Sequence, residues 1–181
     1  MFEAEAAELR RSGVQIGSDS AAQEEARLLD AELERFGLGL RTEALEMARL
    51  YALVYCFENS VRDLINDRLT EKSGASWWLE CVPKKVKDSA ESRHKTAVDE
   101  SWLEGSKGHP VAFVDFGHLE SIITSNWEHF EDLIPSQIWL KQRLLEMEQA
   151  RNFIAHNRAL LPGEFQRLYM YVNDWNRQVG L

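Results

Sequence analysis

EALEMARLYALVYCFENSVRDLINDRLT, residues 43–70, has the strongest helical pattern in the chain. One set of side chains recurs there at intervals of three and four residues, the spacing that places them on one face of an α-helix. A second set of apolar side chains flanks that face and widens it. The two sets are Tyr51, Val54, Glu58, Val61, Ile65 and Arg68, and Leu50, Leu53, Phe57 and Leu64. The stretch therefore favours a helix that packs in a bundle, with the carboxylate of Glu58 as an exception on its apolar face.

The same spacing recurs in four further segments, whose ends coincide with turn-forming residues. Gly37 and Gly39 follow the first segment, Pro135 ends the second, and Ser136 can cap the helix of the third. Each segment has enough apolar positions on one face to contribute to a shared core. The predicted helices cover residues 22–36, 116–134, 137–158 and 163–179.

Residues 71–110 differ in composition from the predicted helices, because they are rich in Gly, Ser and Lys and contain two of the four prolines. We expect a long irregular insert there, with one short helix over 84–98, followed by a short extended piece at 111–115. Taken together, the segments predict an all-α bundle of about five helices with a long loop insert at about 71–110.

The composition indicates one folded domain with an acidic extension. The chain has 181 residues, 44% of them hydrophobic, and a net charge of −9, which argues against a protein that coats nucleic acid. Residues 1–40 hold nine acidic residues and four arginines, whereas residues 136–181 hold six basic and four acidic residues. We expect an acidic N-terminal helical arm at 1–40 and a helical domain at 41–181, whose C-terminal end would better receive an anionic ligand.

Neither the cysteines nor the hydropathy indicates secretion or a membrane. Cys56 and Cys81 have no metal-ligand spacing, and Cys56 lies in an apolar run that predicts a place in the core. No apolar stretch reaches the roughly 18 residues that a membrane span requires. The acidic start of the chain lacks the apolar centre of a secretory signal. We expect a cytoplasmic protein with no membrane partner.

The stretch ARNFIAHNR, residues 150–158, places polar side chains where a core helix is expected. Arg151 occupies a position on the apolar stripe of that helix, and a buried guanidinium needs a partner or a ligand. One interpretation pairs Arg151 with Glu58 inside the bundle, and the alternative places either residue at the rim of its stripe with its charged end in water. The stripe consists of Leu140, Leu144, Met147, Arg151 and Ile154.

The spacing within this stretch determines which side chains can act together. Asn152 and His156 are four residues apart and share a helix face. Arg151 and His156 are five apart, which corresponds to a rotation of roughly 140° on an ideal helix. These two side chains converge only if the helix ends early, which Asn157 and Pro162 favour, or if a second copy of the chain completes the site in a two-fold dimer.

These residue types suit the cleavage of RNA without a metal or a cofactor. A histidine can take the proton of the ribose 2′-hydroxyl, or protonate the leaving oxygen, near neutral pH. An arginine can stabilise the charge that develops on the phosphoryl oxygens, and an asparagine can orient the histidine or hold a phosphate. Such a site predicts a 2′,3′-cyclic phosphate product and no cleavage of DNA, which lacks the attacking hydroxyl.

The arrangement RNFIAHN, residues 151–157, late in an all-α domain resembles the HEPN superfamily, whose mark is Arg-x4–6-His, often with a polar residue after the arginine. The similarity extends over about residues 45–180, and within HEPN domains it is greatest to the Swt-like branch. The segments that carry it are FENSVRDLINDRL (57–69), WW (77–78), VDFGHLESIITSNWEHF (114–130) and ARNFIAHN (150–157).

The resemblance implies a domain of four to five helices that dimerises and, in active members, cuts RNA without a metal. Many such domains are toxins or effectors of defence against phage. By position, the resemblance implies catalytic roles for Arg151, His156 and Asn152. We add Asn157, Glu58, Asn59 and Arg62 as candidate supporting residues.

We therefore expect a homodimeric, metal-independent endoribonuclease, with an antitoxin or regulatory protein as a further candidate partner. Arg158 stands where related toxins often carry a tyrosine that a partner nucleotidyltransferase modifies, which argues against that form of control. The alternative is a non-catalytic HEPN-like module that dimerises or binds RNA or a partner protein. Residues 1–40 would contribute to the dimer or restrain the site. Trp77, Trp78 and Trp102 could stack on bases, although packing within the insert is the better-supported interpretation.

Overall fold

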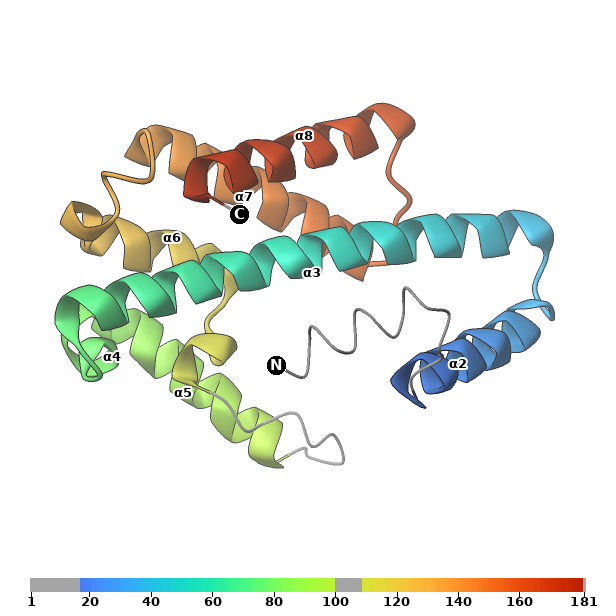
Figure 1. Cartoon of the computed structure of the whole chain (residues 1–181), viewed down its shortest axis with the longest axis horizontal. Coiled ribbons are helices and arrows are strands. Elements are labelled where there is room, and N and C mark those ends of the chain that lie inside the picture. The colour runs from blue at the N-terminus through green and yellow to red at the C-terminus, as the bar shows by residue number, and fades with distance from the viewer. Residues whose placement is uncertain (1–16, 100–108, 181) are drawn as a thin grey trace. The chain divides into compact units, whose positions relative to one another are not determined.

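A computed structural model describes residues 17–99 and 109–180 of the chain (Figure 1). These residues form helices and turns, with no strand among them, which confirms the all-α prediction. The elements are α2 (Gly17–Leu33), α3 (Leu38–Ser73), α4 (Trp77–Cys81), α5 (Lys84–Asp99), the 3₁₀ turn η1 (Pro110–Phe113), α6 (Phe116–Ser125), the 3₁₀ turn η2 (Trp127–His129), α7 (Gln137–Ala155) and α8 (Pro162–Val179).

The chain divides into two compact units, Met1–Glu46 and Met47–Leu181, and α3 runs across the boundary between them. In the first unit, α2 begins earlier than the predicted helix over 22–36 and ends three residues sooner. Leu29 and Phe36, two apolar residues of the predicted helix, are exposed. The separation of an acidic arm at 1–40 from a domain at 41–181 stays a prediction.

The core of the second unit is built around one face of α3. Val54, Val61 and Ile65 are buried on that face, as the periodicity predicted. Tyr51 and Arg68 were expected on the same stripe but lie at the edges of the buried face. The face of α3 that is buried is rotated slightly from the predicted stripe. The buried residues of α3 are Leu50, Val54, Phe57, Val61, Ile65 and Leu69.

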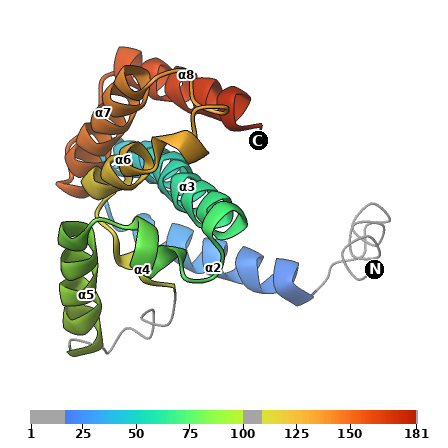
Figure 2. The ribbon, with the colours of Figure 1, turned by 90° about the vertical axis from the view of Figure 1, so that its left-hand side faces the viewer.

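Aromatic side chains join α3 to the C-terminal helices. The Phe57 ring lies 6.1 Å from that of Phe116 in α6 and 5.4 Å from that of Trp175 in α8, measured between centroids. Trp175 in turn stacks on Trp139 of α7, and its indole N–H donates to the hydroxyl of Ser60 at 3.2 Å. These helices gather along the same part of α3 in both ribbon views (Figure 2). A buried aromatic cluster thus fixes α6, α7 and α8 against α3.

The insert at 71–110 is more helical than predicted. The short helix expected over 84–98 is present as α5, whereas α4 lies in a stretch that was expected to be irregular. The expected extended piece at 111–115 is wrong, because this stretch belongs to η1 and the turn into α6. Trp102 lies outside the described residues.

The shape of η1 follows from its first residues. His109 Nδ1 accepts a hydrogen bond from the backbone N–H of Val111 at 3.3 Å, and Pro110 follows directly as the first residue of the turn. The His109 ring stacks on Trp77 at 5.0 Å, although part of the residue remains exposed. Burial lowers the pKa of His109 below its ordinary value, which favours the neutral ring that can accept this bond.

Two further expectations about the helices are wrong. The helix expected over 116–134 ends at Ser125, where the buried Asn126 side chain donates to the carbonyls of Cys81 at 3.0 Å and of Ile122 at 2.8 Å. The end of the helix thus coincides with a side-chain bond from Asn126 to the insert. Cys56 is exposed rather than in the core, because it lies on the face of α3 that points away from the bundle. Among the described helices, none combines the length and the hydropathy that a bilayer crossing requires.

Candidate functional site

The end of α7 is set by a specific backbone turn. The side chain of Ser136 caps its first turn as predicted, accepting from the N–H of Trp139 at 3.1 Å. At the other end Asn157 has φ 55°, a left-handed conformation. Its N–H donates to the carbonyl of Ile154 at 2.9 Å, and the following N–H of Arg158 donates to the carbonyl of Phe153 at 3.3 Å. This bond pair is the Schellman ending of a helix.

The helix therefore ends between the two residues of the Arg-x4-His motif. Arg151 lies in the last full turn of α7, while His156 is the capping residue beyond its end. An early end was one of the two routes by which their side chains could converge. The prediction that α7 continues to residue 158 is correspondingly too long by three residues. Asn157, a candidate supporting residue, has a structural role as the left-handed residue of this turn.

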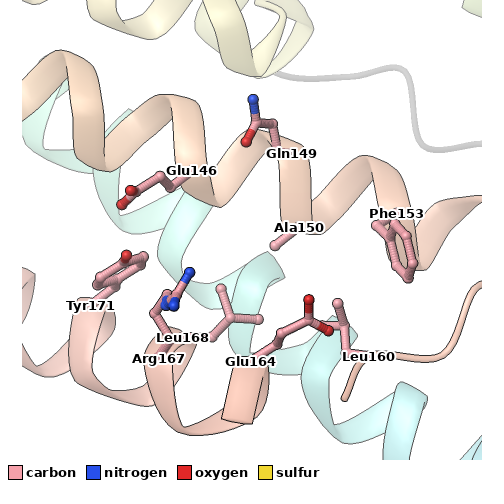
Figure 3. A pocket seen from close by; sticks show the side chains of 9 residues that line it. All are labelled: Glu146, Gln149, Ala150, Phe153, Leu160, Glu164, Arg167, Leu168 and Tyr171. Carbon is pink, nitrogen blue, oxygen red and sulfur yellow. The ribbon is translucent and has the colours of Figure 1, made fainter. Parts of the chain in front are cut away.

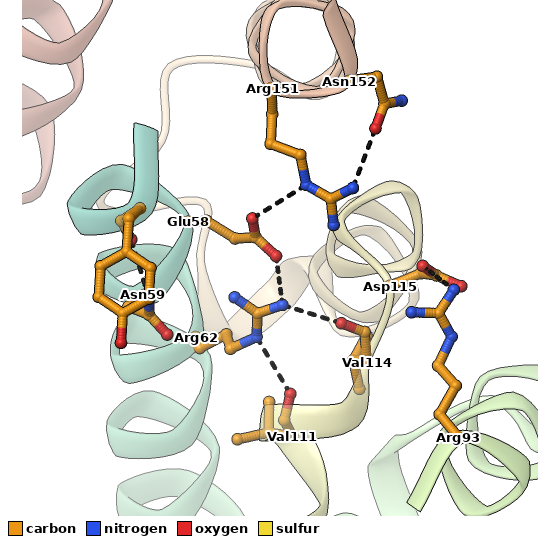
Figure 4. A network of polar contacts seen from close by, with 10 residues as sticks. Glu58, Asn59, Arg62, Arg93, Val111, Val114, Asp115, Arg151 and Asn152 are labelled. Carbon is orange, nitrogen blue, oxygen red and sulfur yellow. Dashed lines mark hydrogen bonds and ion pairs between the residues drawn. The ribbon is translucent and has the colours of Figure 1, made fainter. Parts of the chain in front are cut away.

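Arg151 pairs with Glu58 across the bundle, as one interpretation of the sequence had it. Its Nε lies 3.6 Å from Oε2 of Glu58, and its Nη1 donates to the side-chain oxygen of Asn152 at 3.0 Å (Figure 4). The Glu58 side chain is only 12% exposed, whereas that of Arg151 is 33% exposed. Glu58 is therefore an internal carboxylate, and Arg151 reaches it from the edge of α7.

Arg62 forms the other half of this network. It lies one turn after Glu58 on α3 and donates to the second oxygen of that carboxylate. The same guanidinium donates to two backbone carbonyls at the ends of η1, Val111 at 3.3 Å and Val114 at 2.9 Å (Figure 4). Arg62 was among the candidate supporting residues, but these two partners lie 49 and 52 residues away along the chain and no local pattern indicates them.

One carboxylate is thus shared by two guanidinium groups, which leaves an excess of one positive charge. A groove runs beside this charge, lined by Tyr51, Tyr55, Asn59, Ala112 and Ala155 together with the three charged residues. An anion such as a phosphodiester would be attracted there, since the surrounding protein limits screening by water. Arg151, with its partly exposed guanidinium, is the arginine best placed to meet it.

Asn59 and His156 do not belong to the charged network. The Asn59 side chain donates to the carbonyl of Tyr55 in its own helix at 2.9 Å. His156 is exposed and does not line the groove, and within residues 17–99 and 109–180 its imidazole has no hydrogen-bond partner. A single chain thus brings Glu58, Arg62, Arg151 and Asn152 together and presents His156 separately at the helix end.

A second cavity lies between α7 and α8, and three of the polar side chains that line it, Glu146, Glu164 and Tyr171, have structural partners (Figure 3). Arg143, which is not among the lining residues, contacts two that are: its guanidinium lies 3.6 Å from the ring centroid of Tyr171 and 3.2 Å from a carboxylate oxygen of Glu146. Burial and a hydrogen bond with Glu146 raise the pKa of Tyr171. Glu164 accepts the N–H of Leu161 at 2.7 Å and so caps α8. These roles are structural, so the groove beside Arg151 is the better candidate site.

No three His, Cys, Asp or Glu side chains come together as metal ligands in the parts of the chain that the structure describes.

A helical bundle that carries Arg-x4-His at the end of a late helix, with a polar residue after the arginine, has the features of a HEPN domain. The sequence model of the Swt1-like HEPN family matches residues 53–180, and the chain belongs to this family. No curated protein and no solved structure shows significant similarity to the chain. Membership of this family supports a nuclease-like or RNA-related role.

Proposed function

We propose that the chain is a metal-independent endoribonuclease in which Arg151, Asn152 and His156 carry the reaction. The observation that supports this most directly is the groove in which Arg151 is held by the internal Glu58, next to the helix end that presents His156. Glu58 and Arg62 border the groove but position Arg151 rather than bind the substrate, because their side chains are only 12% and 11% exposed and already bond to each other.

The reaction needs two proton transfers and one stabilised charge. The ribose 2′-oxygen attacks the adjacent phosphorus and loses its proton to a base, while the bond from phosphorus to the 5′-oxygen breaks and that oxygen gains a proton. His156 serves as the base or the acid, and Arg151 stabilises the charge on the non-bridging oxygens. The Asn152 oxygen already accepts from Arg151, so its amide N–H groups are left to hold a phosphate. The products end in a 2′,3′-cyclic phosphate and a 5′-hydroxyl.

A second copy of the chain would complete the site. Two copies related by a two-fold axis would supply one His156 as base and the other as acid, on either side of the scissile phosphate. Tyr51 and Tyr55 support a contact at this place, because both line the groove while remaining 51% and 57% exposed. Exposed tyrosines are enriched at protein interfaces. An enzyme of this kind would suit a cytoplasmic toxin or a phage-defence effector that an antitoxin or regulatory protein holds inactive.

One observation favours a different function, a non-catalytic module that dimerises or binds RNA. His156 lies outside the groove of its own chain, so the catalytic groups do not converge without a partner. In this reading the positive groove binds the RNA backbone and no bond is broken. The two functions make opposite predictions for a cleavage assay.

The test is cleavage of single-stranded RNA by the purified protein in excess EDTA, alongside His156→Ala and Arg151→Ala. We expect each substitution to reduce the cleavage rate by about 100-fold or more, the loss typical when a group that transfers a proton or stabilises charge is removed. His129→Ala and Arg177→Ala remove the same residue types outside the groove and should retain the parent rate. A DNA strand of the same sequence should stay intact.

Equal cleavage by the parent and His156→Ala would show that a contaminant or another residue cuts the RNA. Absence of cleavage by a folded, dimeric parent that still binds RNA would overturn the enzymatic proposal in favour of the binding module.

A further inference from the structure

The turn η1 borders the groove beside Arg151, and it also borders a separate pocket that the proposed function does not use. This pocket is distinct from the cavity between α7 and α8. Its walls come from α4 and α5, which belong to the insert, and from η1, which follows it directly. The residues that matter for its chemistry are Trp78, Lys87, Glu91, His94, Pro110 and Phe113.

The aromatic walls of this pocket are held in place by other rings. The Trp78 indole meets the buried Trp77 edge-on, with centroids 5.7 Å apart, and meets the His109 ring edge-on at 5.9 Å. The Phe113 ring contacts the ring of His94 at 4.6 Å. A ligand would therefore find flat surfaces that are already ordered, which lowers the entropic cost of binding.

Two charged groups lie beside these flat walls. Lys87 and Glu91 are four residues apart on α5 and so share one face of the helix. The Lys87 ammonium group is fixed at the pocket by donating to the carbonyl of Leu79 at 2.8 Å. Glu91 is exposed, and its carboxylate can only accept hydrogen bonds. The pocket thus combines an aromatic surface, a cation and a pure acceptor.

A nucleotide base with its phosphate matches this combination. Unpaired bases stack on aromatic side chains, and an ammonium group can contact the attached phosphate. A carboxylate pairs best with a base edge that offers two adjacent donors, which among the four RNA bases is the Watson–Crick edge of guanine. Adenine, cytosine and uracil each place acceptors beside their donors on that edge.

The pocket is connected to the candidate site through η1. Arg62 holds η1 by the carbonyls of Val111 and Val114, and Ala112, between them, lines the groove. Pro110 and Phe113 of the same turn line the pocket. On the other side, the ion pair between Arg93 and Asp115 ties α5 to the start of α6 (Figure 4). A strand that crosses η1 can therefore reach both places.

We propose that the pocket of Trp78, Phe113 and Glu91 binds an unpaired guanine of an RNA strand, while another phosphate of the same strand lies in the groove beside Arg151. This inference rests on the proposed RNA-directed function, but it requires only that RNA binds, not that it is cut. It gives the insert a role in choosing the RNA sequence. The binding energy of the guanine would fix the register of the strand in the groove.

The test is the affinity of short oligouridylates that carry one central G, inosine or A, measured by calorimetry on the His156→Ala protein so that nothing is cut. We expect the G oligomer to bind most tightly, followed by inosine, which lacks the 2-amino donor, and then A. Trp78→Ala should weaken binding of the G oligomer about 5- to 150-fold, the loss typical of a stacking side chain. Trp78→Phe should retain most of the affinity.

Glu91→Gln is the decisive variant. Glu91 is exposed, so the substitution should not disturb folding, and its expected effect is on the relative affinity for G and A. It should reduce the ratio of G to A affinities toward one, whereas Glu131→Gln, an exposed control outside the pocket, should leave that ratio unchanged. Equal affinities for G and A in the parent, or a ratio that Glu91→Gln does not alter, would overturn the assignment. Binding of guanosine monophosphate as tight as that of the G oligomer would replace RNA by a free nucleotide as the ligand.

The failure of this proposal is distinguishable from the failure of the proposed function. Cleavage by the parent with no base preference would retain the enzyme and reject the pocket. Guanine-dependent binding by a parent that cuts no RNA would retain the pocket and reject the enzyme.

Discussion

Glu58 is the residue on which the candidate site depends, because it serves two arginines at once. Arg62 is 11% exposed and Glu58 12%, so neither charge is stabilised much by water. The pair persists because the remaining donors of Arg62 reach backbone carbonyls of η1. Removing the carboxylate would leave the buried guanidinium without a counter-charge, which costs far more than losing an exposed ion pair.

We expect Glu58→Gln to lower the free energy of unfolding by on the order of 3 kcal/mol, the penalty for one unpaired buried charge. The measurement is urea unfolding followed by circular dichroism. Arg151→Ala should cost less, because that guanidinium is one third exposed. Glu131→Gln, at an exposed position, is the control and should remain within about 0.5 kcal/mol of the parent. A Glu58→Gln protein as stable as the parent would mean that Arg62 does not depend on this carboxylate.

At the scale of elements, the end of α7 determines where His156 is presented. The chain leaves the helix because Asn157 adopts a left-handed conformation, which asparagine tolerates better than most side chains and glycine tolerates best. A residue with a branched Cβ is sterically disfavoured in that conformation. The position of His156 relative to Arg151 therefore depends on its neighbour.

We expect Asn157→Val to destabilise the protein by about 1–2 kcal/mol, the cost of the left-handed region for a β-carbon, while Asn157→Gly should be neutral or slightly stabilising. Thermal unfolding of both proteins checks this. Asn173→Val is the matched control, since Asn173 is exposed within α8 and the two residue types have similar helix propensities. If Asn157→Val is no worse than Asn173→Val, the turn is not under the strain that its geometry implies.

Helices that are defined by regularly spaced apolar residues were predictable from the sequence. Features that depend on single hydrogen bonds between residues far apart in the chain were not. The 3.6-residue period located α3, α7 and α8 to within a few residues, because burial of one face decides those helices. The position of η1 against α3 is fixed instead by bonds from Arg62, and the early end of α6 coincides with the bonds of Asn126 to the insert. The Arg151–Glu58 pair was among the interpretations, since each residue interrupts an apolar stripe. Nothing in the local pattern indicated the carbonyl partners of Arg62.

For the whole molecule, the folded core and about half of the net negative charge lie in different parts of the sequence. Every buried hydrophobic side chain among the described residues falls between Leu50 and Trp175. The nine acidic residues of positions 1–40 lie outside that range. Stability and net charge should therefore respond separately to removal of the N-terminal residues.

We expect a chain lacking residues 1–37, which keeps α3 entire, to unfold within about 3 °C of the parent, since no described core side chain is lost.

The formal charge of the shortened chain changes from −9 to −4, because nine acidic residues and four arginines are removed. RNA, as a polyanion, should then bind more tightly at low salt, and the gain should shrink toward 1 M salt as the Debye length falls to about 3 Å. Titration of labelled RNA into both chains carrying His156→Ala, at low and high salt, measures this. A gain that is independent of salt would indicate that residues 1–37 restrain the groove by contact rather than by charge, and a large fall in the unfolding temperature would show that they belong to the folded domain.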